Sequence, residues 1–251
     1  REVSKNFQKI WIKQGFDFKL STSFNKVIKN NDKISVLIEN KGQTLEIDCD
    51  KILVSMGRKP YTYGLNLENV GVGIDDKGFI QTNKSFQTSV NNIYAIGDCK
   101  KGPMLAHKAS EEGIAVAELL SGQAGQVNYD TIPSVIYTFP EVASVGKTEE
   151  ELKNSSIQYK VGKFPFTANA KATVMQETEG FVKILSDSQT DEVLGVHIIG
   201  ADAGNLIVEL VVAMEFGASA EDLARTCHAH PTLTESIKEA ALNVDKRSIH
   251  I

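Results

Sequence analysis

The chain has 251 residues, is 41% hydrophobic and carries a formal net charge of −5. This is the balance of a globular protein with material for one large or two smaller domains, and without a basic patch it gives no reason to expect nucleic acid as a partner. No apolar run approaches the roughly 20 residues of a membrane-spanning helix, and we expect no membrane partner. Three scattered cysteines, Cys49, Cys99 and Cys227, favour a reducing compartment, for which we expect the cytoplasm.

The first segment is predicted to be a helix that continues from something before it. Val3, Phe7, Ile10 and Trp11 fall at helical spacing, and Gly15 is a plausible end. The sequence opens on an arginine rather than a methionine, and the helix has no cap at its start. We therefore expect the sequence to be the C-terminal part of a longer chain.

A meander of antiparallel strands is predicted next. Polar clusters at residues 30–32 (Asn-Asn-Asp) and 40–42 (Asn-Lys-Gly) separate short apolar runs, which is typical of hairpins. The runs are residues 16–20, 24–28, 34–39 and 44–47. Residues 51–55 then predict a more deeply buried strand, and Gly57 after it leaves room for backbone or ligand to approach.

Residues 61–90 predict loops with brief strands, and residues 92–98 predict an apolar strand closed by Gly97 and Asp98. In an open parallel sheet, ligands bind beyond the carboxyl ends of the strands, which is where Asp98 would lie. Its carboxylate could accept a hydrogen bond from a ligand hydroxyl. The alternative is that Gly97 and Asp98 only turn the chain.

A helix is predicted to open at about residue 102 and to run to about residue 120. Ala109, Gly113, Ala115 and Ala117 keep it slim, which permits close packing. Backbone donors at its N-terminus would favour an anion or a developing negative charge. Two roles are equally open for His107 at the start of this helix: contact with a ligand, or packing and capping within the protein.

The character of the sequence changes near residues 129–132, where we place a domain boundary. Five strand-like runs and then three helices follow, an order that indicates an α+β domain with an antiparallel sheet. The runs are residues 135–138, 142–145, 159–164, 180–185 and 193–199, and the helices are residues 203–216, 220–226 and 232–242. The first of these helices is apolar on most sides, which predicts burial in a core or an oligomer interface.

A segment near the C-terminus reads Cys-His-Ala-His-Pro-Thr-Leu-Thr-Glu and combines two histidines with a helix start. Pro231 suits the first turn and places His230 outside the helix, while Thr232 and Glu235 have the spacing of a capping box. A histidine fixed there with a carboxylate in reach could also serve as a general acid and base. Metal binding is less favoured, because His228 and His230 supply only half of a zinc shell.

Taken in order, five motifs resemble the flavin disulfide reductases, and among them the dihydrolipoamide dehydrogenases. The motifs are Gly57-Arg58-x-Pro60, Ile93-Tyr94-Ala95-Ile96-Gly97-Asp98, Met104-Leu105-Ala106-His107, Pro140-Glu141-Val142-Ala143-x-Val145-Gly146 and His228-Ala229-His230-Pro231-Thr232-Leu233-x-Glu235. The wider family shares the Gly-Asp and His-Pro-Thr stretches. The Met-Leu-Ala-His and His-Ala-His forms favour the dihydrolipoamide group, and the match runs from end to end.

The resemblance implies a fold of α/β plus α+β character in three parts. Residues 1–55 would be the C-terminal part of an NAD-binding domain. Residues 56–130 would be the C-terminal part of an FAD-binding domain. Residues 131–251 would form a dimerisation domain with an antiparallel sheet and helices.

The resemblance also implies where the cofactors FAD and NAD would be contacted. Asp98 would bind a ribityl hydroxyl of FAD. A turn would present backbone N–H groups to the flavin, and it comprises Met104, Leu105, Ala106 and His107. Gly57 would lie at the edge of the NAD site, with Phe24 as a weaker candidate contact.

The implied function is that of an oxidoreductase that reoxidises dihydrolipoamide to lipoamide with NAD. His230 would be its general base, held by Glu235, and would serve the active site of the other subunit of a homodimer. A further partner would be the lipoyl-bearing domain of a 2-oxo acid dehydrogenase complex. The mitochondrial matrix would then be the alternative to the cytoplasm.

The sequence departs from the family pattern in three places. It has no G-x-G-x-x-G fingerprint, because Gly71-Val72-Gly73 lacks both the third glycine and the helix that should follow. Its cysteines form no closely spaced redox pair, and Phe139 stands where some relatives have a histidine. Two alternatives stay open: an inactive dimerisation or binding fragment that keeps relics of a flavin site, and another disulfide reductase of the family.

Overall fold

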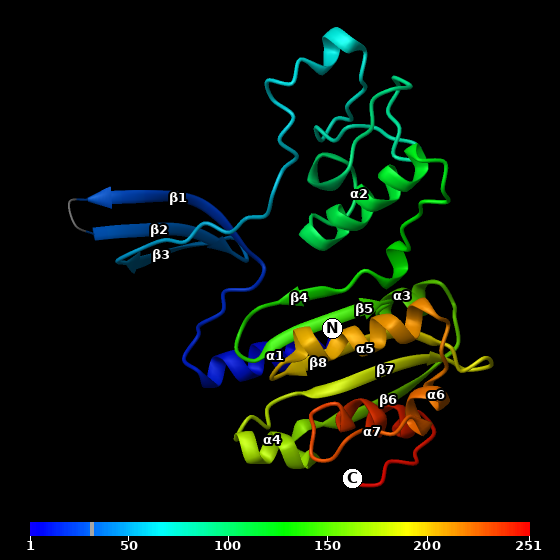
Figure 1. The fold of residues 1–251 in the computed structure, drawn as a ribbon. Coiled ribbons are helices and arrows are strands. Elements are labelled where there is room, and N and C mark those ends of the chain that lie inside the picture. Colours follow the sequence, from blue (N-terminus) through cyan, green and yellow to red (C-terminus); the bar gives the residue numbers. More distant parts are fainter. Residues whose placement is uncertain (31–32) are drawn as a thin grey trace. The chain divides into compact units, whose positions relative to one another are not determined.

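The computed structural model describes residues 1–30 and 33–251. The chain divides into two compact units, one of Gln8–Arg58 and one of Arg1–Phe7 with Lys59–Ile251 (Figure 1). The predicted N-terminal helix is present as α1 (Glu2–Lys13). The three-part division at residues 55 and 130 stays a prediction.

The sheet of the Gln8–Arg58 unit is the predicted meander with one strand fewer. β1 (Thr22–Asn30), β2 (Lys33–Asn40) and β3 (Gln43–Cys49) pair antiparallel in that order. The prediction of a strand at residues 16–20 is wrong, since this segment has no regular secondary structure. Two of the three residues of the turn expected at 30–32 lie outside the described residues.

The predicted buried strand at residues 51–55 is also wrong. Leu53 is 91% exposed and Val54 is 74% exposed. An apolar run becomes a buried strand only if other strands pair with it, and among residues 1–30 and 33–251 none pairs with this one.

Residues 59–105 are held by turns rather than by a sheet, as predicted for 61–90. The segment contains two short 3₁₀ helices, η1 (Leu67–Val70) and η2 (Gly97–Cys99), and a small core of Val72, Ile80 and Ala95. The strand predicted at 92–98 is reduced to a single bridge between Gln87 and Tyr94. Asp98 therefore lies in a 3₁₀ turn and not at the end of a parallel strand.

The predicted slim helix is α2 (Ala106–Leu120), which begins a few residues later than expected, and it packs closely on η2. Gly97 has a φ of +70°, and a Cβ built on it would lie 3.2 Å from the Cβ of Ala109. A Cβ on Gly113 would lie 3.5 Å from Ile96. The small residues of α2 therefore set the position of the Gly97–Asp98 turn. Beyond α2, the short 3₁₀ helix η3 (Tyr129–Thr131) leads into the next sheet.

All five strand-like runs of the C-terminal part are strands of one antiparallel sheet. They are β4 (Ser134–Ile136), β5 (Glu141–Gly146), β6 (Tyr159–Pro165), β7 (Phe181–Asp187) and β8 (Val193–Gly200). The spatial order is β4-β5-β8-β7-β6, so β7 and β8 are central. Both are buried along almost their whole length, as their apolar composition requires.

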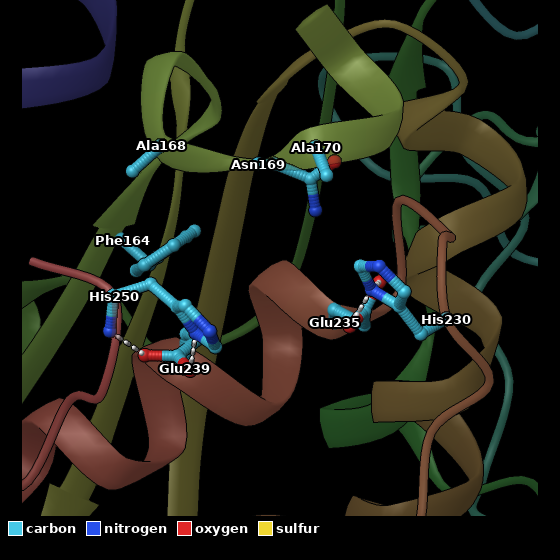
Figure 2. A pocket seen from close by; sticks show the side chains of 8 residues that line it. All are labelled: Phe164, Ala168, Asn169, Ala170, His230, Glu235, Glu239 and His250. Carbon is cyan, nitrogen blue, oxygen red and sulfur yellow. Dashed lines mark hydrogen bonds and ion pairs between the residues drawn. The ribbon is translucent and has the colours of Figure 1, made fainter. Parts of the chain in front are cut away.

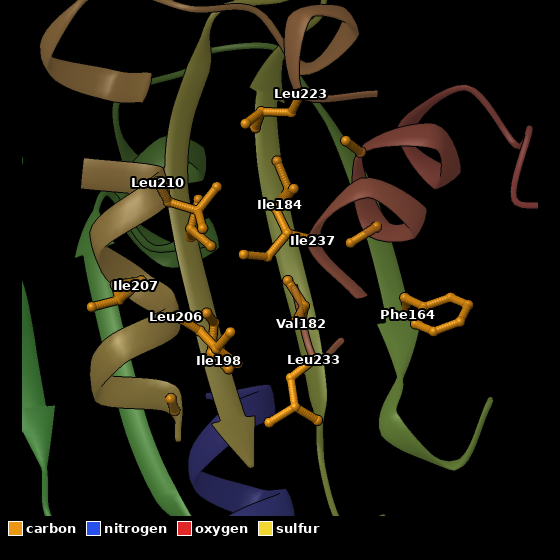
Figure 3. Packing of buried hydrophobic residues seen from close by; sticks show 14 of the residues in the cluster. Phe164, Val182, Ile184, Ile198, Leu206, Ile207, Leu210, Leu223, Leu233 and Ile237 are labelled. Carbon is orange, nitrogen blue, oxygen red and sulfur yellow. The ribbon is translucent and has the colours of Figure 1, made fainter. Parts of the chain in front are cut away.

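The three predicted helices are α5 (Ala203–Glu215), α6 (Ala220–Arg225) and α7 (Glu235–Val244). Three short elements after β5 escaped prediction: α3 (Glu149–Asn154), η4 (Phe166–Ala168) and α4 (Ala170–Met175). α5 packs on β5 and β8, and α7 packs on β6 and β7. Figure 3 shows Leu206 and Leu210 of α5 and Ile237 of α7 directed at the central strands.

The apolar surface of α5 is divided between core and solvent. Leu206, Ile207 and Leu210 are buried, whereas Val208 is 54% exposed and Val212 is 52% exposed. The sequence predicted burial in a core or in an interface, and one face of the helix is in the core. Within the described ranges, no helix has the length and apolar character needed to cross a membrane.

Candidate active site

The segment between α6 and α7 presents His230 at the surface of the C-terminal sheet domain. The His230 side chain is 70% exposed, and its Nδ1 lies 2.9 Å from Oε1 of Glu235 (Figure 2). Glu235 is the first residue of α7, where the helix dipole favours a negative charge. The structure thus brings together the two residues that the sequence predicted as an acid–base pair.

Glu235 is held as a carboxylate by its own backbone as well as by His230. The Thr232 amide donates to Glu235 Oε2 at 2.8 Å. Burial alone raises the pKa of this carboxyl, but the hydrogen bonds from the Thr232 amide and His230 outweigh it and lower the pKa. An ionised partner is therefore present at neutral pH.

The predicted capping box is half correct. The Glu235 carboxylate does reach back to the Thr232 amide, but the Thr232 hydroxyl donates to Ala229 O at 2.7 Å instead of capping the helix. α7 begins at Glu235 with Thr234 as its N-cap, so Pro231 is not in the first helical turn, as predicted, but before the helix. Residues 231–234 instead form a tight turn that closes on the carboxylate.

The contact with Glu235 determines which nitrogen of His230 carries the proton. A carboxylate only accepts hydrogen bonds, so Nδ1 must donate and the neutral ring keeps its lone pair on Nε2. A carboxylate behind a histidine fixes the tautomer and stabilises the imidazolium after protonation. His230 can therefore take up a proton at Nε2.

His228, two residues earlier, is in the opposite situation. Its Nε2 lies 2.8 Å from Glu209 Oε1 and its Nδ1 lies 3.0 Å from Thr226 O, and its side chain is only 5% exposed. The hydrogen bond to Glu209 raises the pKa of His228 despite burial. Both nitrogens of His228 face acceptors, which favours the imidazolium form and directs neither nitrogen to a metal.

A pocket adjoins the His230–Glu235 pair (Figure 2). A second carboxylate of α7, Glu239, lies in its wall and binds His250 at 2.7 Å. The remaining lining residues are Phe164, Ala168, Asn169 and Ala170. Only Glu239 could have been expected near Glu235 from the sequence, because it follows four residues later on the same predicted helix; the other five residues come from two separate segments.

The candidate flavin residues gather around the Gly97–Asp98 turn. Asp98 is exposed, and both backbone groups of Gly97 are bound by α2. The Gly97 amide donates to Glu112 Oε2 at 2.6 Å, and Lys108 Nζ donates to Gly97 O at 2.9 Å. Lys108 and Glu112 are both fully buried, so they hold the turn in place from the protein interior.

Glu112 is the centre of a closed network. Besides Gly97 and Lys108 it accepts from Tyr129 OH at 2.6 Å and from Lys100 Nζ at 3.1 Å. Burial alone raises the pKa of Glu112, but these four donors outweigh it and lower the pKa, while burial and the bond to Glu112 raise the pKa of Tyr129. The i, i+4 spacing of Lys108 and Glu112 was the one signal in the sequence that could have revealed this pair.

The predicted Met104–His107 turn spans the start of α2, since Ala106 and His107 are the first two residues of the helix. Leu105 is the N-cap and gives no side-chain hydrogen bond, so the first amides of the helix are not capped by it. His107 is exposed, and its Nε2 lies 2.8 Å from Pro133 O, so the ring is bound by its own chain without being buried. The role proposed for the backbone amides is independent of that ring.

The two candidate NAD contacts, Phe24 and Gly57, belong to the Gln8–Arg58 unit. Phe24 is on β1 and 51% exposed, and Gly57 has a φ of +88° in an open segment. Cys49, Cys99 and Cys227 are all free thiols. Phe139 is 66% exposed, and nothing in the structure assigns it a function.

Comparisons with known proteins show to which protein family the chain belongs. The dimerisation-domain model of the pyridine nucleotide-disulphide oxidoreductases matches residues 132–241, and a second model of that family matches residues 1–113. The chain belongs to the pyridine nucleotide-disulphide oxidoreductase family, as the sequence motifs indicated.

Within that family the chain is similar to dihydrolipoyl dehydrogenases. It is 54% identical to the mitochondrial enzyme of Caenorhabditis elegans and 52% identical to that of Dictyostelium discoideum, covering 96% and 100% of this chain. These matches cover 49% and 52% of the two relatives, so the chain spans about half the length of the curated relatives it matches.

Solved structures of the family share the fold. LpdA from Mycobacterium tuberculosis aligns with a TM-score of 0.84 at 28% identity, over 94% of this chain and 51% of that one. The HOCl-induced flavoprotein disulfide reductase RclA from Escherichia coli aligns with a TM-score of 0.85 at 26% identity, over 94% of this chain and 54% of that one. The α/β plus α+β architecture predicted from the sequence is confirmed.

Proposed function

We propose that this chain supplies the acid–base half of a dihydrolipoyl dehydrogenase, which oxidises dihydrolipoamide to lipoamide with NAD. The observation that carries the proposal is the His230–Glu235 contact, which leaves an exposed histidine with its Nε2 lone pair available. Thiol oxidation needs such a base, because a thiolate rather than a thiol attacks a disulfide.

In the proposed reaction His230 Nε2 accepts the proton of one dihydrolipoamide thiol. The thiolate attacks one sulfur of a redox disulfide supplied from outside the described residues, whose own cysteines are free, and the other sulfur leaves as a thiolate. The second substrate thiol then loses its proton and attacks the substrate sulfur of the resulting mixed disulfide, so that lipoamide closes and the enzyme sulfur leaves as a thiolate. In sum, dihydrolipoamide loses two electrons and two protons, NAD gains a hydride, and one proton is released.

Glu235 has two tasks in this scheme. It keeps the proton of the neutral ring on Nδ1, and it stabilises the imidazolium that forms when Nε2 is protonated. Its lowered pKa supports both tasks, because a protonated Glu235 would do neither well.

The residues present suit the cofactors FAD and NAD. Asp98 offers an exposed carboxylate on a rigid turn, and α2 begins at Ala106 without a side-chain cap from Leu105, which suits a developing negative charge on a flavin. Gly57 and Phe24 are our candidates for the NAD contact. Bound FAD would pass the electron pair from the reduced, dithiol form of that disulfide to NAD.

We further propose a homodimer in which His230 serves the active site of the second copy. The exposed face of α5, with Val208, Val212 and the neighbouring Phe216, supports a protein interface, as does the match to a dimerisation domain. The lipoyl-bearing domain of a 2-oxo acid dehydrogenase complex would deliver the substrate. The names of the relatives favour mitochondria and give no support to the cytoplasm that we first expected.

The test is NAD reduction by the full-length protein that carries this sequence, with dihydrolipoamide or reduced glutathione as the thiol. We expect turnover with dihydrolipoamide at about 1–1,000 per second, the usual range for enzymes, and none with glutathione. Turnover with glutathione alone would favour another disulfide reductase. Flavin-free protein without activity towards either thiol would favour the inactive binding fragment.

A further inference from the structure

A buried asparagine, Asn169, connects the His230 segment to a different part of the fold. It lies at the start of α4, is only 3% exposed and lines the pocket beside His230 and Glu235 (Figure 2). We propose that Asn169 is a positioning residue for the His230–Glu235 pair. This inference rests on the proposed function for its catalytic meaning but not for its geometry.

All hydrogen-bonding groups of the Asn169 amide are used. Nδ2 donates to Thr232 O at 3.0 Å and to Ser236 Oγ at 2.9 Å, and Oδ1 accepts from the Ala172 amide at 2.9 Å. The orientation of the amide is fixed by chemistry, because a backbone carbonyl only accepts and a backbone amide only donates. The Asn169 amide therefore binds two backbone groups and one side chain, and it can do so in only one orientation.

The two residues that Asn169 holds flank Glu235. Thr232 accepts from Asn169 at its carbonyl and donates its amide to the Glu235 carboxylate at 2.8 Å. Ser236, the residue after Glu235, is fully buried and receives the second Nδ2 hydrogen bond. The path from Asn169 through Thr232 to Glu235 ends on His230 Nδ1, and each step is a hydrogen bond.

His230 itself has little else to hold it. Its side chain is 70% exposed, and the only hydrogen bonds that its ring makes among the described residues are those to Glu235. The position of the ring therefore depends on the carboxylate, and the position of the carboxylate depends on the turn that Asn169 clamps. A loss of orientation at the reacting atom is costly, since a misplacement of about 1 Å can lower a rate by about 100-fold.

Asn169 also caps α4, and the test must separate that role from the clamp. Asn169→Asp keeps an oxygen for the Ala172 amide, and aspartate caps helices as well as asparagine does. It removes both Nδ2 donors and sets a carboxylate against Thr232 O. Thr148→Ala is the matched control, because Thr148 caps α3, another helix of the same length that is not in the pocket.

The decisive readout is the tautomer of His230, measured by ¹⁵N NMR of histidine-labelled full-length protein. Wild-type and Thr148→Ala protein should show the Nδ1–H form, whereas Asn169→Asp should shift the neutral ring towards the Nε2–H form that free imidazole side chains prefer. With dihydrolipoamide, Asn169→Asp should lower kcat by about 10- to 100-fold with a small change in KM. An unchanged tautomer with unchanged kcat overturns the inference.

Ser236→Ala provides a second variant if Asn169→Asp does not fold. It removes one of the two acceptors of Nδ2 and leaves the helix cap intact, so a smaller shift of the tautomer in the same direction is expected, and no shift counts against the clamp. Wild-type protein that fails to oxidise dihydrolipoamide overturns the proposed function alone. The tautomer measurement decides the role of Asn169 in either case.

Discussion

Glu112 and Glu235 are two carboxylates with opposite surroundings. Glu112 is fully buried and receives hydrogen bonds from four groups of its own chain. Glu235 receives one backbone amide and one imidazole, and that imidazole is exposed. Both have a lowered pKa, so ionisation alone does not tell a structural carboxylate from a functional one.

The difference lies in what each carboxylate leaves open. Glu112 itself is buried, and all four of its donors come from its own chain, two of them the buried Lys108 and the buried Gly97 amide, so its loss should affect folding. The partner of Glu235 keeps one nitrogen free, so its loss should affect chemistry. Stability and turnover should therefore respond separately to mutations in the two regions.

The largest effect is expected from Glu112→Ala. Removing one member of a buried ion pair leaves Lys108 charged and unpaired, which costs about 3–5 kcal/mol of unfolding free energy. Urea denaturation measures it, with Glu111→Ala on the exposed side of the same helix as the control. If both variants unfold at the same urea concentration, the closed network does not stabilise the fold.

The next largest effect is expected from His230→Gln, and it should appear in turnover. Loss of a general base lowers dihydrolipoamide oxidation by about 100-fold or more. The unfolding free energy should stay within about 0.5 kcal/mol of wild type, because the side chain is exposed. A large loss of stability with little loss of turnover would reverse the assignment of the two regions.

Glu151 provides a calibration, because it is a carboxylate that only completes a helix cap. It accepts from the Thr148 amide and hydroxyl, both at 2.8 Å, at the start of α3. Thr148→Ala should lower the unfolding free energy by about 1 kcal/mol and leave turnover unchanged. Differential scanning calorimetry and the steady-state assay check the two parts, and a change in turnover would show that activity responds to stability in general.

The smallest effect concerns His228 and depends on pH. Its pKa is raised by Glu209, so the pair stabilises the fold fully below the unfolded-state pKa of about 6.5, and this stability is lost as the pH rises through the folded-state pKa. Glu209→Gln should therefore cost about 0.5 kcal/mol near about pH 5.5 and less near about pH 8.5. Equal costs in urea unfolding at both pH values would contradict a charged pair.

The sequence predicted elements whose patterns are local and failed where distant partners decide the outcome. The five strands from β4 to β8 and the helices α5 to α7 were predicted because their apolar runs are long and regular. Residues 51–55 read as a buried strand, but burial requires a partner strand, which a local pattern cannot show. The prediction of a strand at residues 92–98 was wrong for the same reason.

The candidate site was predictable only where its residues are close in sequence. His230 and Glu235 are five residues apart, so their contact followed from the helix start. Asn169 lies 63 residues before Thr232, and Glu239 meets His250 only because the chain turns back after α7. The clamp and the pocket therefore required the structure.

The central claim is that His230 acts on the thiol substrate and not on the rest of the redox cycle. Stopped-flow absorbance of the flavin in His230→Gln protein, reduced either by dihydrolipoamide or by NADH, tests it directly. We predict that reduction by dihydrolipoamide slows by about 100-fold, while reduction by NADH keeps its wild-type rate within about twofold. Equal slowing of both reductions, or of neither, would contradict the account.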